Sequence, residues 1–137
     1  VTIEELPTRN TIYAVRVDGT FPLMKVRAIP AQQKPYPSLS QAADSQSVFV
    51  STNITGTIVG FYFPVFLSGI NVEGYHLHFI GDDRETGGHI LDLILPENTI
   101  VLYDTTPEFT LVLPTSGDFL EADFSQDLRE EVARAET

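Results

Sequence analysis

Three closely spaced histidines are the residues best suited to chemistry in this sequence. His76, His78 and His89 are the only histidines among 137 residues, and the chain has no cysteine. Neutral imidazole is a common metal ligand, and three protein ligands with one open position are usual for catalytic zinc. The three histidines therefore predict a divalent-metal site. Zinc is preferred, although three-histidine sites also take Fe, Mn, Ni or Co.

The spacing of these histidines predicts how they meet. Side chains alternate faces in a β-strand, so His76 and His78 share one face of Tyr75 to Ile80, opposite Leu77 and Phe79. The polar, glycine-rich stretch 81–88 predicts a chain reversal that brings His89 alongside, approximately facing His78. The alternative is that the histidines are unrelated polar side chains on a solvent-facing strand.

Other charged residues near the histidines have simpler interpretations. Asp82, Asp83 and Glu85 could reach a metal or orient a histidine, but a solvated acidic turn is the favoured interpretation. Alternation within its strand places Asp92 on the face away from the metal. On composition alone Arg27, one of eight basic residues, is interpreted as a surface charge.

Composition and charge limit the classes of partner. Eight basic against 19 acidic residues give a net charge of −11, which argues against nucleic acid and anionic membranes as partners. The sequence has no continuous apolar stretch of about 18 residues, the length that a membrane-spanning helix requires. The length suits one domain, so residues 1–137 are expected to form a single zinc-binding domain.

The remaining pattern predicts a mainly β fold of α+β type, a largely antiparallel and barrel-like sheet with a short C-terminal helix. Asp18-Gly19 predicts a tight hairpin turn between strands 11–17 and 21–29. Three prolines in 30–39 predict an ordered loop or extended arm, and Ser40 to Ser47 a short helix. Later strands are expected at 48–51, 56–63, 75–80, 89–95, 99–103 and 109–113. After Ser125, Leu128 and Val132 predict the short helix.

The sequence resembles the acetolactate decarboxylase family nearly from end to end. The hallmark segments are Gly74-Tyr75-His76-Leu77-His78-Phe79 and Gly87-Gly88-His89. Residues 10–21, Lys25-Val26-Arg27, Lys34-Pro35-Tyr36-Pro37, residues 56–61 and residues 69–72 are also similar.

The resemblance implies zinc-dependent decarboxylation of 2-acetolactate to acetoin. It implies that His76, His78 and His89 hold Zn²⁺, that Arg27 is the catalytic arginine, and that Glu136 is a C-terminal glutamate that folds over the site. The flanking sequence of Glu136 matches poorly, so Glu130 and Glu131 compete for that role. The substrate suits such a site because its hydroxyl and ketone oxygens can chelate one cation.

Family members are about twice as long as this chain, which resembles their C-terminal half. Residues 1–10 carry neither an initiator Met nor a signal pattern. We therefore expect a cleaved or truncated enzyme, or a shortened homologue that does not complete the reaction alone, because the family's N-terminal half with a further active-site glutamate is absent. A homodimer, or association with the missing N-terminal portion, is expected. Localisation stays undetermined, with the cytoplasm favoured over secretion.

Two other functions fit the same histidines. Cupin-type metalloenzymes also combine a His-x-His pair with a third His, but they normally add a Glu four or five residues after the second His, where this chain has Asp82 and Asp83. A non-catalytic, metal-stabilised binding or assembly module is the second alternative. Iron or manganese with oxygen consumption would favour the first, and zinc without acetoin formation the second.

Overall fold

The computed structural model describes residues 6–136, with side chains described as far as residue 133. Five strands form one sheet, namely β1 (Ile12–Ala28), β2 (Ser47–Phe63), β3 (Gly74–Gly81), β4 (Gly87–Ile94) and β5 (Leu102–Thr106). The helical elements are α1 (Leu39–Ala43), the 3₁₀ turns η2 (Val65–Leu67) and η3 (Asp118–Glu121), and α2 (Arg129–Glu136). The predicted mainly β fold with a short C-terminal helix is confirmed.

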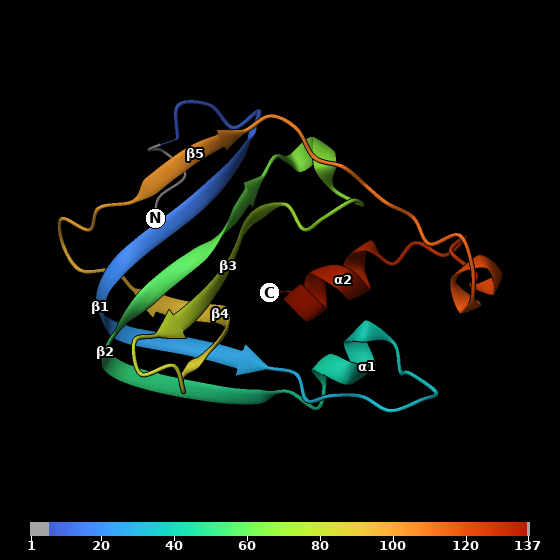
Figure 1. Ribbon diagram of the computed structural model, residues 1–137, viewed down its shortest axis with the longest axis horizontal. Coiled ribbons are helices and arrows are strands. Elements are labelled where there is room, and N and C mark those ends of the chain that lie inside the picture. The colour runs from blue at the N-terminus through green and yellow to red at the C-terminus, as the bar shows by residue number, and fades with distance from the viewer. Residues whose placement is uncertain (1–5, 137) are drawn as a thin grey trace.

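The sheet closes on itself because β1 is paired along both edges. β1 pairs with β2, β2 with β3, β3 with β4, and β4 returns to the second half of β1, all antiparallel. β5 pairs with the first half of β1, on the edge that β4 occupies farther along. Figure 1 shows the long β1 and β2 ribbons curving together round this ring. The result is the predicted barrel-like arrangement, which gives the sheet an inner and an outer face.

The inner face holds the hydrophobic core. Phe21 and Phe79 are buried there with their rings edge to face and their centroids 5.7 Å apart. Val17, Met24 and Ile58 are also almost wholly buried and belong to the same cluster. Residues alternate along each strand, so the side chains between these core positions lie on the outer face of the ring.

The predicted hairpin at Asp18-Gly19 is wrong. β1 passes straight through both residues, and Asp18 and Gly19 pair with Thr57 and Gly56 of β2. The Asp18 carboxylate accepts a 2.8 Å hydrogen bond from Arg16 and a 2.7 Å bond from the Thr57 hydroxyl. Continuous pairing with β2 therefore overrides the local preference of Asp-Gly for a turn. For the same reason the two strands expected at 48–51 and 56–63 are one strand, β2.

The expected strand at 109–113 is also wrong, because the structure leaves this segment as an irregular arm. Phe109, Leu111, Val112 and Leu113 are exposed there. Their β propensity is ineffective without a neighbouring strand to pair with. The strand expected at 99–103 begins later, at Leu102. Figure 1 shows the arm passing from β5 to the outlying η3 turn before the chain returns through α2.

The predicted helix near Ser40 is confirmed as α1, and its start has a clear local cause. The Ser38 side chain accepts from the Gln41 backbone N–H while the Gln41 side chain accepts from the Ser38 N–H, which completes a capping box. α1 packs against α2, and the Ser40 hydroxyl donates to the Glu131 carboxylate between them. Among the described residues, none of the helices has the length and apolar character needed to cross a membrane.

Candidate metal centre

The three histidines converge on the outer face of the ring. His78 and His89 are direct cross-strand partners of β3 and β4, as predicted, and His76 precedes His78 by two residues on the same face. The Nε2 atoms of His76 and His78 are 3.2 Å apart. One ligand nitrogen from each of the three rings lies within 4.8 Å of the other two. The structure therefore contains a three-histidine group that could hold a metal ion.

The nitrogen positions fit a tetrahedral metal. Two imidazole nitrogens bound at about 2.0–2.1 Å to tetrahedral zinc lie about 3.3–3.4 Å apart, close to the observed His76–His78 separation. The ring of His89 stands nearly perpendicular to both others, at interplanar angles of 80° and 82°. Three imidazoles from two adjacent strands thus bring one nitrogen atom each close together.

His78 and His89 belong to a row of cross-strand partners that runs round the outer face of the ring. Each residue in the row is the register partner of the next, so all of them share the outer face. The row runs through Leu102, Arg16, Val59, His78, His89 and Arg27. Because β1 closes the ring, it supplies both Arg16 and Arg27, on opposite sides of the histidines.

Arg27 lies beside the histidines and is buried. It is the register partner of His89 and retains only 5% of its accessible surface. The composition-based interpretation of Arg27 as a surface charge is therefore wrong. A buried guanidinium is costly unless it is well partnered, and Arg27 is partnered within the protein.

Two glycines let the backbones approach closely round the histidines. Gly88 has φ +148°, and a Cβ atom there would lie 2.4 Å from the carbonyl oxygen of Arg27. A Cβ on Gly60 would lie 2.0 Å from the carbonyl oxygen of His76. Sequence reasoning assigned these glycines no positional role, although the Gly-Gly-His run was visible as a motif.

The acidic residues between β3 and β4 form a turn, as the favoured interpretation predicted. Asp83 accepts hydrogen bonds from the backbone N–H groups of Glu85 and Thr86 at 3.0 and 3.1 Å, and from the Thr86 hydroxyl at 3.1 Å. These N–H donors, led by that of Glu85, lower the pKa of Asp83 below its ordinary value. Asp83 therefore fixes the reversal that brings His89 to His78.

Asp92 departs from the expected alternation. Val26 pairs with Ile90 but Lys25 pairs with Asp92, so β4 contains a bulge between these pairs. Ile90 and Leu93 both pack against the core, which puts Asp92 on the outer face with Lys25. The prediction that Asp92 lies on the face opposite the histidines is therefore wrong, because a bulged residue resets the period of two.

The candidate Glu136 is the last residue of α2, and its side chain lies outside the described residues. The start of α2 is well defined. Asp127 accepts a 3.1 Å bond from the Arg129 backbone N–H and a 2.6 Å bond from its guanidinium. These contacts, chiefly the guanidinium, lower the pKa of Asp127 to about 2. The competing candidate Glu131 accepts from Ser40 and so joins α2 to α1.

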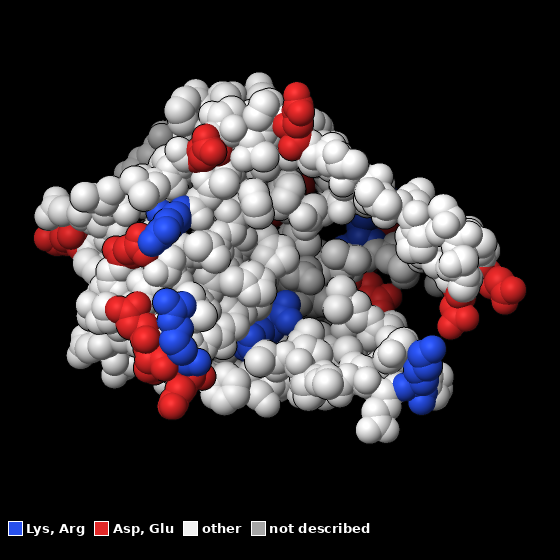
Figure 2. All heavy atoms as spheres, viewed as in Figure 1, with Lys and Arg blue, Asp and Glu red and all other residues white. Residues whose placement is uncertain are grey.

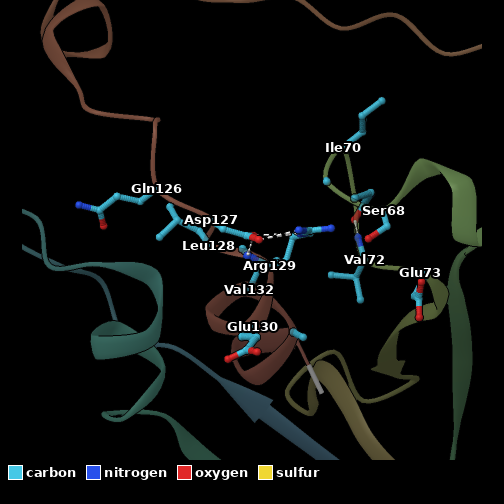
Figure 3. A pocket seen from close by; sticks show the side chains of 13 residues that line it. Ser68, Ile70, Val72, Glu73, Gln126, Asp127, Leu128, Arg129, Glu130 and Val132 are labelled. Atoms are coloured by element: carbon cyan, nitrogen blue, oxygen red, sulfur yellow. Dashed lines mark hydrogen bonds and ion pairs between the residues drawn. The ribbon is translucent and has the colours of Figure 1, made fainter.

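A cavity of about 560 Å³ separates the first turn of α2 from the loop that leads into β3. Figure 3 shows the Arg129–Asp127 ion pair on the helix side, with Val72 and Glu73 on the loop side. Figure 2 shows a recess between the sheet and the C-terminal arm, with Lys or Arg atoms at its floor. α2 thus stands over a hollow rather than packing flush on the sheet.

A second hollow begins at the histidines themselves. It is a groove of about 640 Å³ on the outer face, lined on one side by His76 and His78. Val59, Phe61, Phe63 and Leu102 supply apolar lining from β2 and β5. Alternation in the sequence placed the histidines on one face, but it gave no sign of this groove, because the strands that build it are distant in the chain.

Comparison with known proteins gives a consistent family. The profile of the family described as Alpha-acetolactate decarboxylase matches residues 2–126. The chain is 48% identical over 131 residues to the alpha-acetolactate decarboxylase of Methanosarcina mazei, covering 96% of this chain and 45% of that protein. For the Bacillus licheniformis protein of the same name the identity is 43%, over 96% of this chain and 52% of the relative. The chain spans about half the length of the curated relatives it matches.

Solved structures agree with this assignment. The alpha-acetolactate decarboxylase of Bacillus subtilis strain 168 superposes with a TM-score of 0.90 at 39% identity, covering 97% of this chain and 57% of that one. A Staphylococcus aureus protein of unknown function, described as similar to alpha-acetolactate decarboxylase, gives a TM-score of 0.85 at 34% identity. It covers 97% of this chain and 58% of that structure.

Proposed function

The chain belongs to the alpha-acetolactate decarboxylase family, and we propose that it carries the metal centre for decarboxylation of 2-acetolactate to acetoin. The observation that supports this most directly is the row in which buried Arg27 follows His89 and His78 on one face. A cation site beside a guanidinium suits a substrate that is both a ketone and a carboxylate. The substrate is therefore a small molecule.

We propose Zn²⁺ as the metal and His76, His78 and His89 as its ligands. All three donors are imidazole nitrogens, a ligand set that suits zinc, and the 3.2 Å between the Nε2 atoms of His76 and His78 suits tetrahedral coordination. When bound, zinc supplies Lewis-acid stabilisation of negative charge on oxygen. His78 is exposed and lines the outer groove with His76, which leaves room for substrate there.

The reaction requires an acceptor for an electron pair and a source of one proton. The bond between C2 and the carboxylate breaks, CO₂ leaves, and the electron pair passes to the neighbouring ketone to form an enediolate. One proton is then added to carbon to give acetoin. The protein therefore has to orient the carboxylate, stabilise charge on oxygen and deliver the proton to one carbon.

Arg27 is proposed to bind the carboxylate and then the enediolate. Its guanidinium cannot act as a base, but it donates several hydrogen bonds in a fixed plane. Its position at the end of the row holds it on one side of the histidines. Glu136, at the end of α2, is proposed to move the proton, since that helix is held near the ring by its contact with α1.

The assembly is proposed to include further protein surface, either a second copy or the part that the longer relatives carry. Val48, Phe49 and Val50 are consecutive in β2 and each is at least 45% exposed. Alternation places them on both faces of the strand, so one sheet face alone does not bury them. Light scattering after size exclusion measures whether this chain is a dimer, and a strictly monomeric chain would remove the homodimer from the proposal.

Metal analysis joined to an acetoin assay tests the function. Purified chain is analysed for bound metal, then supplied with racemic 2-acetolactate, with a His78→Ala variant as the control. Stoichiometric zinc with acetoin formation that His78→Ala abolishes supports the proposal. Zinc without acetoin favours a metal-stabilised binding module, and iron or manganese with oxygen consumption favours a cupin-like enzyme. His78→Ala that keeps stoichiometric zinc overturns the ligand assignment.

A further inference from the structure

The helix α2 depends on α1 for its place. It runs only from Arg129 to Glu136, and a helix of this length is marginal without tertiary contacts. Every residue of 107–130 except Phe119 is exposed, so the arm that leads to α2 gives it little support. The next side chains to be partly buried are those of Glu131 and Val132. Because α2 packs against α1, this contact sets where the helix lies.

A hydrogen bond between side chains far apart in the sequence joins the two helices. The Ser40 hydroxyl donates to the Glu131 carboxylate, and the pair is partly buried. Hydrogen bonds to an ionised acceptor are stronger than neutral ones, and partial burial limits competition from water. Ser40 lies in the first turn of α1, and the Ser38 hydroxyl oxygen is 3.1 Å from its own. The donor is therefore built into a capped helix.

The helix α2 borders a space that leads to the histidines. Glu130 and Val132 line the hollow between α2 and the loop before β3, and Figure 3 shows both side chains on its helix side. Asn71 of that loop lines the same hollow. Asn71 also lines the groove that contains His76 and His78. The two hollows therefore meet at Asn71, and the placement of α2 bears on the metal centre.

We infer that the Ser40–Glu131 hydrogen bond is a clasp that fixes the last turn of α2, and that both are positioning residues for proton transfer. The inference rests on the proposed function, in which Glu136 gives one proton to carbon and regains one from water. A rise of 1.5 Å per residue places Glu136 about 7.5 Å along the helix axis from Glu131. A helix held at Glu131 therefore has little freedom at its end. Glu131 holds the helix and does not itself move the proton.

Three serine substitutions test the clasp. Ser40→Ala removes the donor, and alanine is the best helix former, so α1 itself is not weakened. Ser40→Thr keeps a hydroxyl at the same position. The matched control is Ser45→Ala, because the Ser45 hydroxyl donates to the carbonyl oxygen of Ala42, 2.7 Å away within the same segment. Zinc content, kcat, KM and the enantiomeric excess of the acetoin are measured for each variant.

The expected change is in proton delivery rather than in substrate binding. In Ser40→Ala, kcat falls about tenfold because the proton donor is misplaced, while KM stays within about twofold. The enantiomeric excess of acetoin also falls, because water protonates the released enediolate from either face. A smaller fraction of folded protein would not change this excess. Ser40→Thr restores both values and Ser45→Ala leaves them unchanged, whereas an unaltered kcat and excess in Ser40→Ala overturn the inference.

Glu131→Gln separates holding the helix from moving the proton. Glutamine keeps an oxygen that accepts from Ser40 but has no carboxyl proton to transfer. The clasp predicts that kcat stays within about threefold, and that Ser40→Ala combined with Glu131→Ala is no slower than either alone. Near-complete loss of activity in Glu131→Gln, with Ser40→Ala close to normal, would make Glu131 the proton donor and overturn the clasp.

Hydrogen exchange gives a readout that is independent of turnover. The Val132 backbone N–H donates to the carbonyl oxygen of Leu128 at 2.9 Å, so its exchange rate reports opening of α2. It is expected to exchange about tenfold faster in Ser40→Ala and at an unchanged rate in Ser45→Ala. Equal rates in Ser40→Ala and the unsubstituted chain overturn the clasp. If the unsubstituted chain turns over no substrate, the proposed function fails, and exchange still decides whether Ser40 holds α2.

Discussion

Arg27 and His89 face each other across the seam where β1 closes on β4. β1 and β4 are far apart in the sequence, and their direct pairing closes the ring. Gly88 is what lets the seam close at this point, because its hydrogen faces the carbonyl oxygen of Arg27. Backbone pairing thereby places the candidate metal ligand His89 beside the buried Arg27.

Gly88→Ala tests the seam. The new Cβ would meet the Arg27 carbonyl oxygen, and Gly88 also has φ +148°, where L side chains are strained. We expect the free energy of unfolding to fall by about 1–3 kcal/mol, together with weaker zinc binding. Gly19→Ala is the control in the same ring, because a Cβ atom at Gly19 would have nothing within 4 Å of it. Urea unfolding of both apo variants measures the difference, and equal stabilities would contradict this account of the seam.

Arg27→Gln tests the proposed role of the guanidinium. Glutamine keeps much of the side-chain bulk but removes the charge that would face the carboxylate. If the chain decarboxylates 2-acetolactate, kcat/KM should fall by about 10²–10³, the range seen when a single charge-stabilising donor is lost. Zinc stoichiometry should be unchanged, because Arg27 is not a ligand. A variant with full activity would remove Arg27 from the mechanism.

If the chain binds zinc as proposed, removing the zinc should loosen the fold as well as stop the proposed reaction. Metal that binds only the folded state raises stability with its free concentration. The melting temperature is therefore expected to fall on treatment with EDTA and to recover with added Zn²⁺. His89→Ala should abolish this response. Differential scanning calorimetry with and without zinc measures it, and an EDTA response retained by His89→Ala would contradict the ligand assignment.

Low pH should weaken the β3–β4 turn. The pKa of Asp83 is lowered in the folded state by the N–H groups of Glu85 and Thr86, so its contribution is complete above the unfolded value of about 3.9. It is lost as the pH falls through the lower folded value. NMR titration of the Asp83 carboxyl carbon checks the direction. Asp83→Asn should flatten the acid side of the stability curve, whereas Asp82→Asn, whose carboxylate does not cap the turn, should not.

Phe21→Ala should unfold much of the ring. Phe21 is fully buried and meets Phe79 edge to face, one residue away from His78. Truncating a buried Phe costs about 3–5 kcal/mol, and the β3 backbone that carries the histidines would shift into the space. Phe66→Ala is the control because Phe66 is 66% exposed. Circular dichroism melting should separate the two variants clearly, and comparable melting temperatures would refute the core assignment.

Features that depend on neighbouring residues were predictable from the sequence, and those that depend on ring closure were not. Alternation and a short polar reversal were enough to pair His78 with His89. The turn predicted at Asp18-Gly19 failed because the whole of β1 pairs with β2, from Tyr13 to Ala28. The burial of Arg27 arises from contact with β4, which lies far along the chain, and no local pattern reports it.

Small departures from regularity also escaped prediction. One bulge in β4 returned Asp92 to the outer face, because the extra residue in the strand shifts the alternation by one. In the segment 109–113 the composition favours a strand, but a strand also needs an edge to pair with. Local propensity is therefore informative here only where the ring supplies a partner.

The double pairing of β1 also governs how the chain can fold. The second half of β1 pairs with β4 and its first half pairs with β5. Both of these strands are synthesised long after β1, so the ring closes late and through contacts of high sequence separation. Such topologies fold slowly, and on a ribosome β1 would leave the exit tunnel with one edge still bare. The three histidines lie on the local β3–β4 hairpin, but Arg27 comes from β1. The complete centre therefore forms only when the ring closes.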